Sequence, residues 1–147
     1  MAVRIQYASV LLAAAALLAP AAHAATPAVW RGHTFQGYAA RAVVSASGAL
    51  VTNLRTRYAL GCSDGSTVVR RLLLSRDNGD TLLVGADGRF TTSGTVASGV
   101  PEKGSGSLTY RVSGRVRSDR ITGTLRVDYA LDSGVRCSTQ LVGFVLR

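Results

Sequence analysis

The sequence predicts an all-β domain of about eight antiparallel strands, folded as a sandwich or a partly closed barrel. Two observations predict this fold class. Apolar and polar residues alternate over several stretches, whereas the spacing typical of a helix is nowhere sustained. Turn dipeptides such as Asn78-Gly79 and Asp87-Gly88 recur roughly every 10–16 residues, which is the rhythm of antiparallel sandwiches and barrels.

The first 24 residues have the features of an export signal. Arg4 is followed by an apolar run of about 12 residues, shorter than the roughly 20 that cross a bilayer as a helix. Ala22-His23-Ala24 then supplies the small-x-small pattern of a signal-peptidase site. We therefore expect residues 1–24 to be removed and residues 25–147 to form a single β domain. The protein would be exported to the periplasm or the extracellular space, with no transmembrane segment after processing.

The alternation and the turn signals together locate the strands. Residues 50–62, with Val51, Arg55 and Arg57 pointing outward, follow the two-residue period of a strand. The last predicted strand is expected to contain a bulge near Gln140, because its alternation changes phase there. The predicted strands span residues 35–45, 50–62, 67–74, 81–85, 89–96, 108–116, 121–131 and 135–146.

Two of these strands can be paired in register. Ser118-Asp119 is expected to be a two-residue hairpin loop, which sets each inward residue of one strand opposite an inward residue of the other. Gly114 and Gly123 would then face each other, leaving a gap that lets the sheet bend or makes room for a large ring. The other expected pairs are Val112 with Leu125, Tyr110 with Val127, and Arg111 with Arg126.

Cys62 and Cys137 are the only cysteines, and in an oxidising compartment we expect them to form one disulfide. Such a bridge would close a loop of about 75 residues and contribute about 4.5 kcal/mol in the chain-entropy model. The close spacing of a redox-active pair, such as C-x-x-C, is absent from the sequence.

Residues suited to catalysis or metal binding are few. His33 is the one histidine after the export signal, and the sequence contains no G-x-S-x-G nucleophile motif. Most acidic residues fall in turns, where Asp accepts local backbone hydrogen bonds. Residues 77–80 are better interpreted as a hairpin turn than as a calcium loop, since the ligand at position 12 is missing. We therefore expect no catalytic residues, metal site or cofactor.

The sequence carries 17 Lys+Arg against 8 Asp+Glu, a net charge of +9 that becomes +8 without Arg4. All the remaining bases except Lys103 are arginine, which binds phosphate, sulfate and carboxylate groups through forked hydrogen bonds. A domain this basic is drawn to anionic surfaces. Outside the cytoplasm these are envelope polymers, acidic glycans and lipid head groups, and nucleic acid is not expected as a partner.

Five arginines form the candidate anion site. In the hairpin register Arg111 lies opposite Arg126, and Arg115 lies two residues along on the same outward face. Arg55 and Arg57 are expected to extend this patch or to make a second one. The alternative is a solvated face whose mutual repulsion is screened by salt.

Three aromatic residues, Trp30, Phe35 and Tyr38, cluster near the start of the mature chain. Because large apolar rings are usually buried, we expect them to plug one end of the barrel. The alternative is a surface platform for sugars.

Five short motifs follow one another along the mature chain: residues 62–65, 88–90, 112–116, 123–126 and Cys137. Through them the chain resembles a group of small exported bacterial all-β proteins of unassigned function, and this resemblance brings no functional residues. Through Tyr58 and residues 62–65 it also resembles, more weakly, the β-barrel inhibitors of C-type lysozyme. Residues 105–110 are one residue longer than the Ser-Gly-x-x-Tyr loop of those inhibitors, and a charge of +8 would repel the basic lysozyme.

These features predict an exported, non-catalytic protein that binds an anionic envelope or extracellular ligand. Two alternatives stay open: a carrier that holds a small apolar ligand inside the barrel, and a secreted enzyme inhibitor. The sequence makes no prediction about the oligomeric state.

Overall fold

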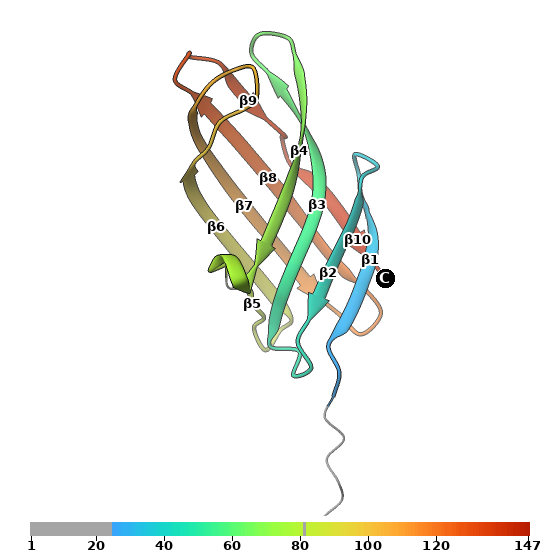
Figure 1. Cartoon of the computed structure of the whole chain (residues 1–147). Helices are drawn as coiled ribbons and strands as arrows, with labels where there is room; N and C mark the ends of the chain where they lie inside the picture. The colour runs from blue at the N-terminus through green and yellow to red at the C-terminus, as the bar shows by residue number, and fades with distance from the viewer. Residues whose placement is uncertain (1–24, 81) are drawn as a thin grey trace, which may run out of the picture.

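The computed structural model describes residues 25–80 and 82–147 (Figure 1). The predicted signal peptide, residues 1–24, lies outside the described residues, as does Thr81. The strands are β1 (Ala28–Thr34), β2 (Ala39–Val44), β3 (Leu50–Cys62), β4 (Thr67–Ser75), β5 (Leu82–Leu83), β6 (Arg89–Ala97), β7 (Gly106–Val116), β8 (Ile121–Leu131), β9 (Arg136–Ser138) and β10 (Val142–Leu146). A 3-10 turn, η1 (Arg76–Asn78), follows β4.

All strand pairs are antiparallel, which confirms the predicted fold class. The order β10-β1-β2-β3-β9-β8 closes on itself through the pairing of β10 with β8, giving a six-stranded barrel. Two further strands, β7 and β6, extend the sheet beyond β8, and β4 and β5 pair with the other edge of β3 (Figure 1). Over the residues described, the chain has no helix of the length and apolarity needed to cross a membrane.

The β7–β8 hairpin has the predicted register. Arg117 and Arg120 close the two-residue loop, and Gly114 lies opposite Gly123. The predicted gap at the glycines is filled by two rings, because Phe90 and Phe144 lie opposite them on the neighbouring strands. A Cβ built on either glycine would overlap the ring beside it.

The N-terminal strand β1 was not predicted, and the strand predicted at residues 35–45 is shorter, with residues 35–38 forming the turn into β2. The sequence of β1 has a weak strand pattern because Gly32 stands at one of its inward positions. That glycine is required by packing, since a Cβ there would collide with the carbonyl of Val145.

The predicted bulge near Gln140 is a complete break. Gln140 has a φ of 57°, and it separates β9 from β10. Both pieces pair with β8, β9 near its end and β10 near its start, but on their other side β9 pairs with β3 and β10 pairs with β1. The break therefore lets one stretch of chain close the barrel on both sides.

A second irregularity reverses one prediction. The pairing of β2 with β3 shifts by one residue between Val43 and Val44, so that Val44 lies opposite Val51. Val51 consequently points into the core and is only 2% exposed, contrary to the outward orientation predicted for it. Arg55 and Arg57 lie beyond the shift and point outward as predicted.

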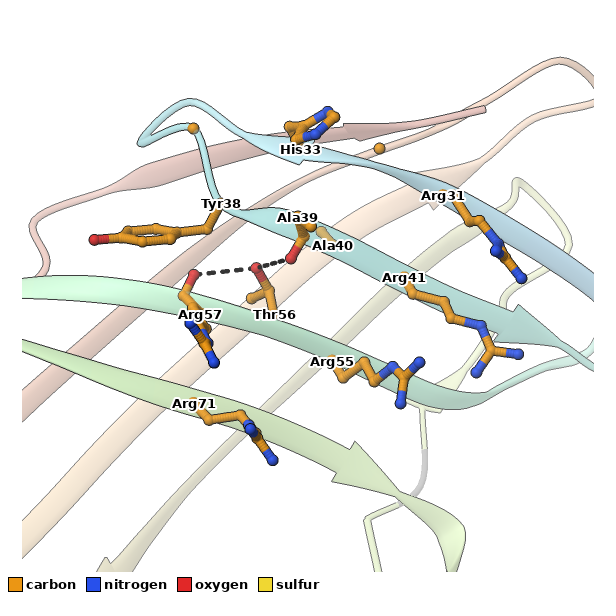
Figure 2. A pocket seen from close by; sticks show the side chains of 12 residues that line it. Arg31, His33, Tyr38, Ala39, Ala40, Arg41, Arg55, Thr56, Arg57 and Arg71 are labelled. Atoms are coloured by element: carbon orange, nitrogen blue, oxygen red, sulfur yellow. Dashed lines mark hydrogen bonds between the residues drawn. The ribbon is translucent and has the colours of Figure 1, made fainter.

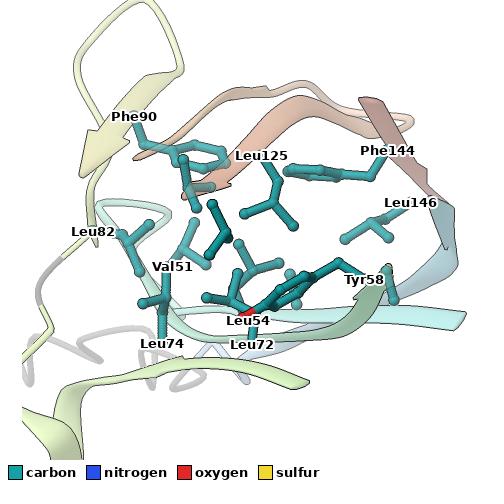
Figure 3. Packing of buried hydrophobic residues seen from close by; sticks show 14 of the residues in the cluster. Val51, Leu54, Tyr58, Leu72, Leu74, Leu82, Phe90, Leu125, Phe144 and Leu146 are labelled. Carbon is teal, nitrogen blue, oxygen red and sulfur yellow. The ribbon is translucent and has the colours of Figure 1, made fainter. Parts of the chain in front are cut away.

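Side chains fill the interior of the barrel (Figure 3). Tyr58 and Leu60 of β3 and Val127 of β8 are almost completely buried. Burial raises the pKa of the Tyr58 phenol, and a hydrogen bond with Tyr129 adds to this effect. Val100, in the loop between β6 and β7, is also buried and belongs to the same core.

The predicted disulfide joins Cys62 at the end of β3 to Cys137 in β9. The two residues lie directly opposite each other, and the neighbouring backbone bond runs from Ser63 N–H to the Arg136 carbonyl oxygen. The cysteines are therefore a non-hydrogen-bonded pair, in which strands approach closely. This explains a Cα–Cα distance of 3.9 Å, below the roughly 4.4–6.8 Å usual for disulfides.

Candidate functional site

The predicted arginines lie on two separate surfaces. Arg111, Arg115 and Arg126 point outward from β7 and β8, whereas Arg55 and Arg57 point outward from β3. Neither β7 nor β8 pairs with β3, and in the sheet order the short strand β9 lies between β3 and β8. Arg55 and Arg57 therefore form a second patch rather than extending the first.

The second patch is larger than predicted. Register places Arg31 of β1 opposite Arg41 of β2, and Arg41 opposite Arg55 of β3. In the next row, Arg57 of β3 lies opposite Arg71 of β4. We call these five residues the arginine face.

The side chains of the arginine face lie over one shallow depression of about 710 Å³, at whose margin His33 and Tyr38 also lie. Figure 2 shows Arg31, Arg41 and Arg55 extending in the same direction along the sheet. Hydrogen bonding fixes the strands beneath, because the Thr56 hydroxyl donates to the Ala39 carbonyl oxygen at 3.1 Å. The guanidinium groups therefore stand on rigid paired strands rather than on a loop.

No carboxylate neutralises the arginine face among the residues described. The ion pairs in the described part of the chain are formed by bases outside this face, namely Arg89, Lys103, Arg120 and Arg126. The Nε atom of Arg41 is buried and has no acceptor within the described part of the chain. Like charges directly opposite each other destabilise a sheet, and a buried donor without a partner costs further free energy.

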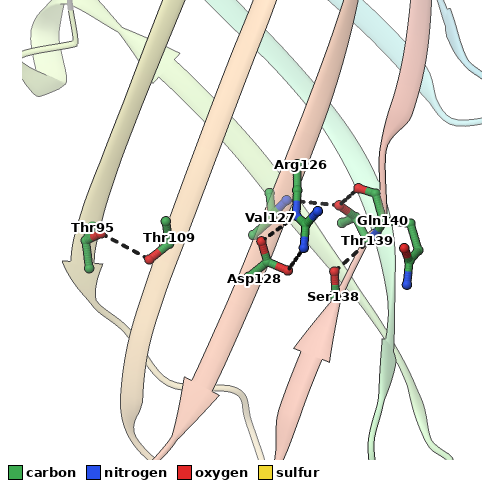
Figure 4. A network of polar contacts seen from close by, with 8 residues as sticks. All are labelled: Thr95, Thr109, Arg126, Val127, Asp128, Ser138, Thr139 and Gln140. Carbon is green, nitrogen blue, oxygen red and sulfur yellow. Dashed lines mark hydrogen bonds and ion pairs between the residues drawn. The ribbon is translucent and has the colours of Figure 1, made fainter.

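The first patch differs because one of its arginines, Arg126, forms an ion pair with Asp128 (Figure 4). Arg126 donates two hydrogen bonds to Asp128, at 2.8 and 3.4 Å. These bonds lower the pKa of Asp128, although partial burial acts in the opposite direction. Arg115 Nε donates to the Asp87 carbonyl oxygen at 2.9 Å, which leaves Arg111 as the member with neither a side-chain hydrogen bond nor an ion pair among the described residues.

Sequence reasoning missed Arg31, Arg41 and Arg71 because their proximity depends on pairing between strands. A signal was nevertheless present. Residues 25–63 contain four arginines and no aspartate or glutamate. A stretch this long without an acid predicts that the surface built from it carries unneutralised charge.

The expectation that three aromatic residues plug the barrel is wrong for two of them. Phe35 is 80% exposed, and Tyr38 lies at the depression of the arginine face. Only Trp30 packs against the core, and it is half-buried. The cause is the β1–β2 turn, which places residues 35–38 on the outside of the barrel.

The described residues contain no group of three or more His, Cys, Asp or Glu side chains that could hold a metal ion. His33 lies among arginines, and the residues that line the depression beside it include no carboxylate. Comparisons with protein-family models, curated proteins and solved structures found no match to this chain.

The opposed arginines predict a measurable repulsion. We expect Arg41→Gln to stabilise the fold by about 0.5 kcal/mol, because it removes a charge between two others. A double-mutant cycle of Arg41→Gln and Arg55→Gln, followed by urea unfolding, should give an unfavourable coupling that shrinks as salt rises. Arg117→Gln, in the exposed hairpin loop, is the control and should leave stability unchanged within error. A favourable coupling between Arg41 and Arg55 would contradict this arrangement.

Proposed function

We propose that this protein is an exported, non-catalytic β domain that binds an anionic envelope or extracellular ligand through the arginine face. One observation carries the proposal. Five arginines stand in register on four strands, with no carboxylate partner among the described residues, and the central Arg41 has a buried donor without an acceptor. Natural proteins often keep a destabilised arrangement where function requires it.

The chemistry of the face favours phosphate, sulfate or carboxylate groups. A guanidinium group presents a rigid fork of donors that matches two oxygens of such an anion. Rows of arginines about 5 Å apart, the separation of neighbouring strands, can contact successive charges on one ligand. A phosphate-bearing polymer and a phospholipid head group share this chemistry.

The packed interior supports this proposal over the alternative of an internal carrier. The core positions are occupied by side chains such as Tyr58 and Leu125, which are at most 1% exposed. A barrel of this size either fills its interior or holds one small ligand. The depressions over the two arginine patches lie on the outside of the barrel.

Co-sedimentation with purified cell envelopes tests the proposal. We expect the protein to sediment at low salt and to be released as salt rises, because counterions screen the arginines. The double variant Arg41→Gln/Arg55→Gln should lose at least tenfold in affinity. Arg76→Gln/Arg117→Gln removes the same charge from exposed positions outside the face and is the matched control.

Two further comparisons identify the source of the anion and separate a specific site from the effect of net charge. Vesicles with and without an anionic phospholipid, beside a soluble polyphosphate, distinguish a lipid head group from a polymer as the source of the anion. Equal losses in the two double variants would show that net charge alone drives binding, and the arginine face would not be a site.

A further inference from the structure

An exposed phenyl ring marks a second surface, which begins beside the arginine face at the end of β1 and runs away from it across β10, β8, β7 and β6. Phe35 donates its backbone N–H to the Gly143 carbonyl oxygen at 2.8 Å, which continues the β1–β10 pairing by one residue. Its ring lies against Gly143, where a Cβ would overlap it, and the side chain is 80% exposed. One face of the ring thus rests on backbone and the other faces solvent.

Hydroxyl groups continue in line from this ring. Gly143 lies opposite Thr124 of β8, Thr124 opposite Ser113 of β7, and Ser113 opposite Thr91 of β6. The side chains of Thr124, Ser113 and Thr91 point outward, because the row one residue along each strand carries the buried rings of Phe90 and Phe144, which point inward. The Ser113 and Thr124 hydroxyls lie 3.1 Å apart. Across five strands this row is about 20 Å long, at about 4.8 Å per strand.

Arginines flank the hydroxyl row on both sides. On β7, Arg115 and Arg111 are each two residues from Ser113, so they lie on the same outward face, one on each side of the row. A depression of about 930 Å³ covers this part of the sheet, and both arginines line it together with Thr91, Ser113 and Thr124.

We propose that this row is a binding site for an acidic oligosaccharide, with one end stacked on Phe35. A sugar ring presents a face of C–H groups, which the negative face of a phenyl ring attracts. Sugar hydroxyls both donate and accept hydrogen bonds, as do the serine and threonine hydroxyls of the row. Carboxylate or sulfate groups on the sugars would meet Arg111 and Arg115. The strand spacing is close to the length of one pyranose unit, so a chain crossing the strands places about one sugar on each.

This site shares no residue with the arginine face, and it recognises the sugar rings of its ligand as well as the charge. The probe is a hexasaccharide of mannuronic acid, with the neutral mannose hexasaccharide beside it, and binding is measured by calorimetry. Phe35→Ala should weaken binding of the acidic hexasaccharide at least tenfold, and Phe35→Tyr should retain it. The control Leu141→Ala removes another exposed apolar side chain, 69% exposed, outside the row and should have no effect.

The remaining arms separate this site from general attraction of a basic protein. We expect Arg111→Gln to weaken binding of the acidic hexasaccharide but not of the neutral one, and a disaccharide to bind much more weakly than a hexasaccharide. The variant Arg41→Gln/Arg55→Gln should bind the neutral mannose hexasaccharide as the wild type does, because that ligand carries no charge for the arginine face to bind. Unchanged binding of both hexasaccharides in folded Phe35→Ala, or loss of the neutral hexasaccharide in the Arg41/Arg55 variant instead, would overturn the assignment.

Discussion

Replacing Cys62 and Cys137 together by alanine is expected to lower the free energy of unfolding by about 4.5 kcal/mol. The bridge joins residues 75 apart in sequence, so that its loss frees a long loop in the unfolded chain. For a domain of this size we expect the melting temperature to fall by about 15 °C. Urea unfolding of the variant beside the oxidised and reduced wild type gives the measurement.

Reduced wild type and the double alanine variant should unfold at similar urea concentrations, because both lack the cross-link. The bridge joins β9 to β3, and the pairing of these two strands closes one side of the barrel. We therefore expect amide hydrogen exchange to increase first in β9 when the bridge is reduced. A loss of less than about 1 kcal/mol would contradict a stabilising role for this disulfide.

Gly123→Ala should destabilise the fold by about 2–3 kcal/mol, although it adds a single methyl group. The added carbon would lie 2.6 Å from the Ser113 carbonyl oxygen and would also overlap the ring of Phe144. A backbone oxygen cannot move without disturbing the strand pairing. The ring can move only by leaving its place in the core.

Gly61→Ala is the matched control for this variant. Gly61 also lies within a strand, but nothing stands within 4 Å of the position that its Cβ would take. We expect this change to be neutral or slightly stabilising, since glycine weakens a strand interior. The difference between the two alanine variants, measured by thermal unfolding, isolates the cost of the packed rings. Equal melting temperatures would mean that the rings do not fill the gap.

The features of the fold that depend on residues close together in the sequence were predictable, and those that depend on pairing between distant strands were not. The β7–β8 register follows from a two-residue loop and an alternating pattern, both contained in about 20 residues, and it was predicted correctly. Val51 was assigned the wrong orientation because a one-residue shift in pairing leaves no mark on the sequence of β3 alone. The strand β1 was missed because Gly32 is explained only by the backbone of β10.

The candidate site shows the same division. The outward orientation of Arg55 and Arg57 follows from the period of one strand and was predicted. Their neighbours Arg41 and Arg71 reach them only through β2 and β4, whose register the sequence does not reveal. The predicted patch at Arg126 was weakened by an acid two residues away on the same face, and this pairing was visible in the sequence.

The affinity for a soluble polyphosphate, measured by calorimetry over a range of salt concentrations, tests the role of the arginine face most directly. For flexible polyanions, each neutralised phosphate contributes about 0.7 to the slope of log affinity against log salt. We predict that Arg41→Gln/Arg55→Gln binds at least tenfold more weakly than wild type and has a slope smaller by about 1.4. The control Arg76→Gln/Arg117→Gln should keep the wild-type slope. An unchanged slope and affinity in the Arg41/Arg55 variant would contradict anion binding at this face.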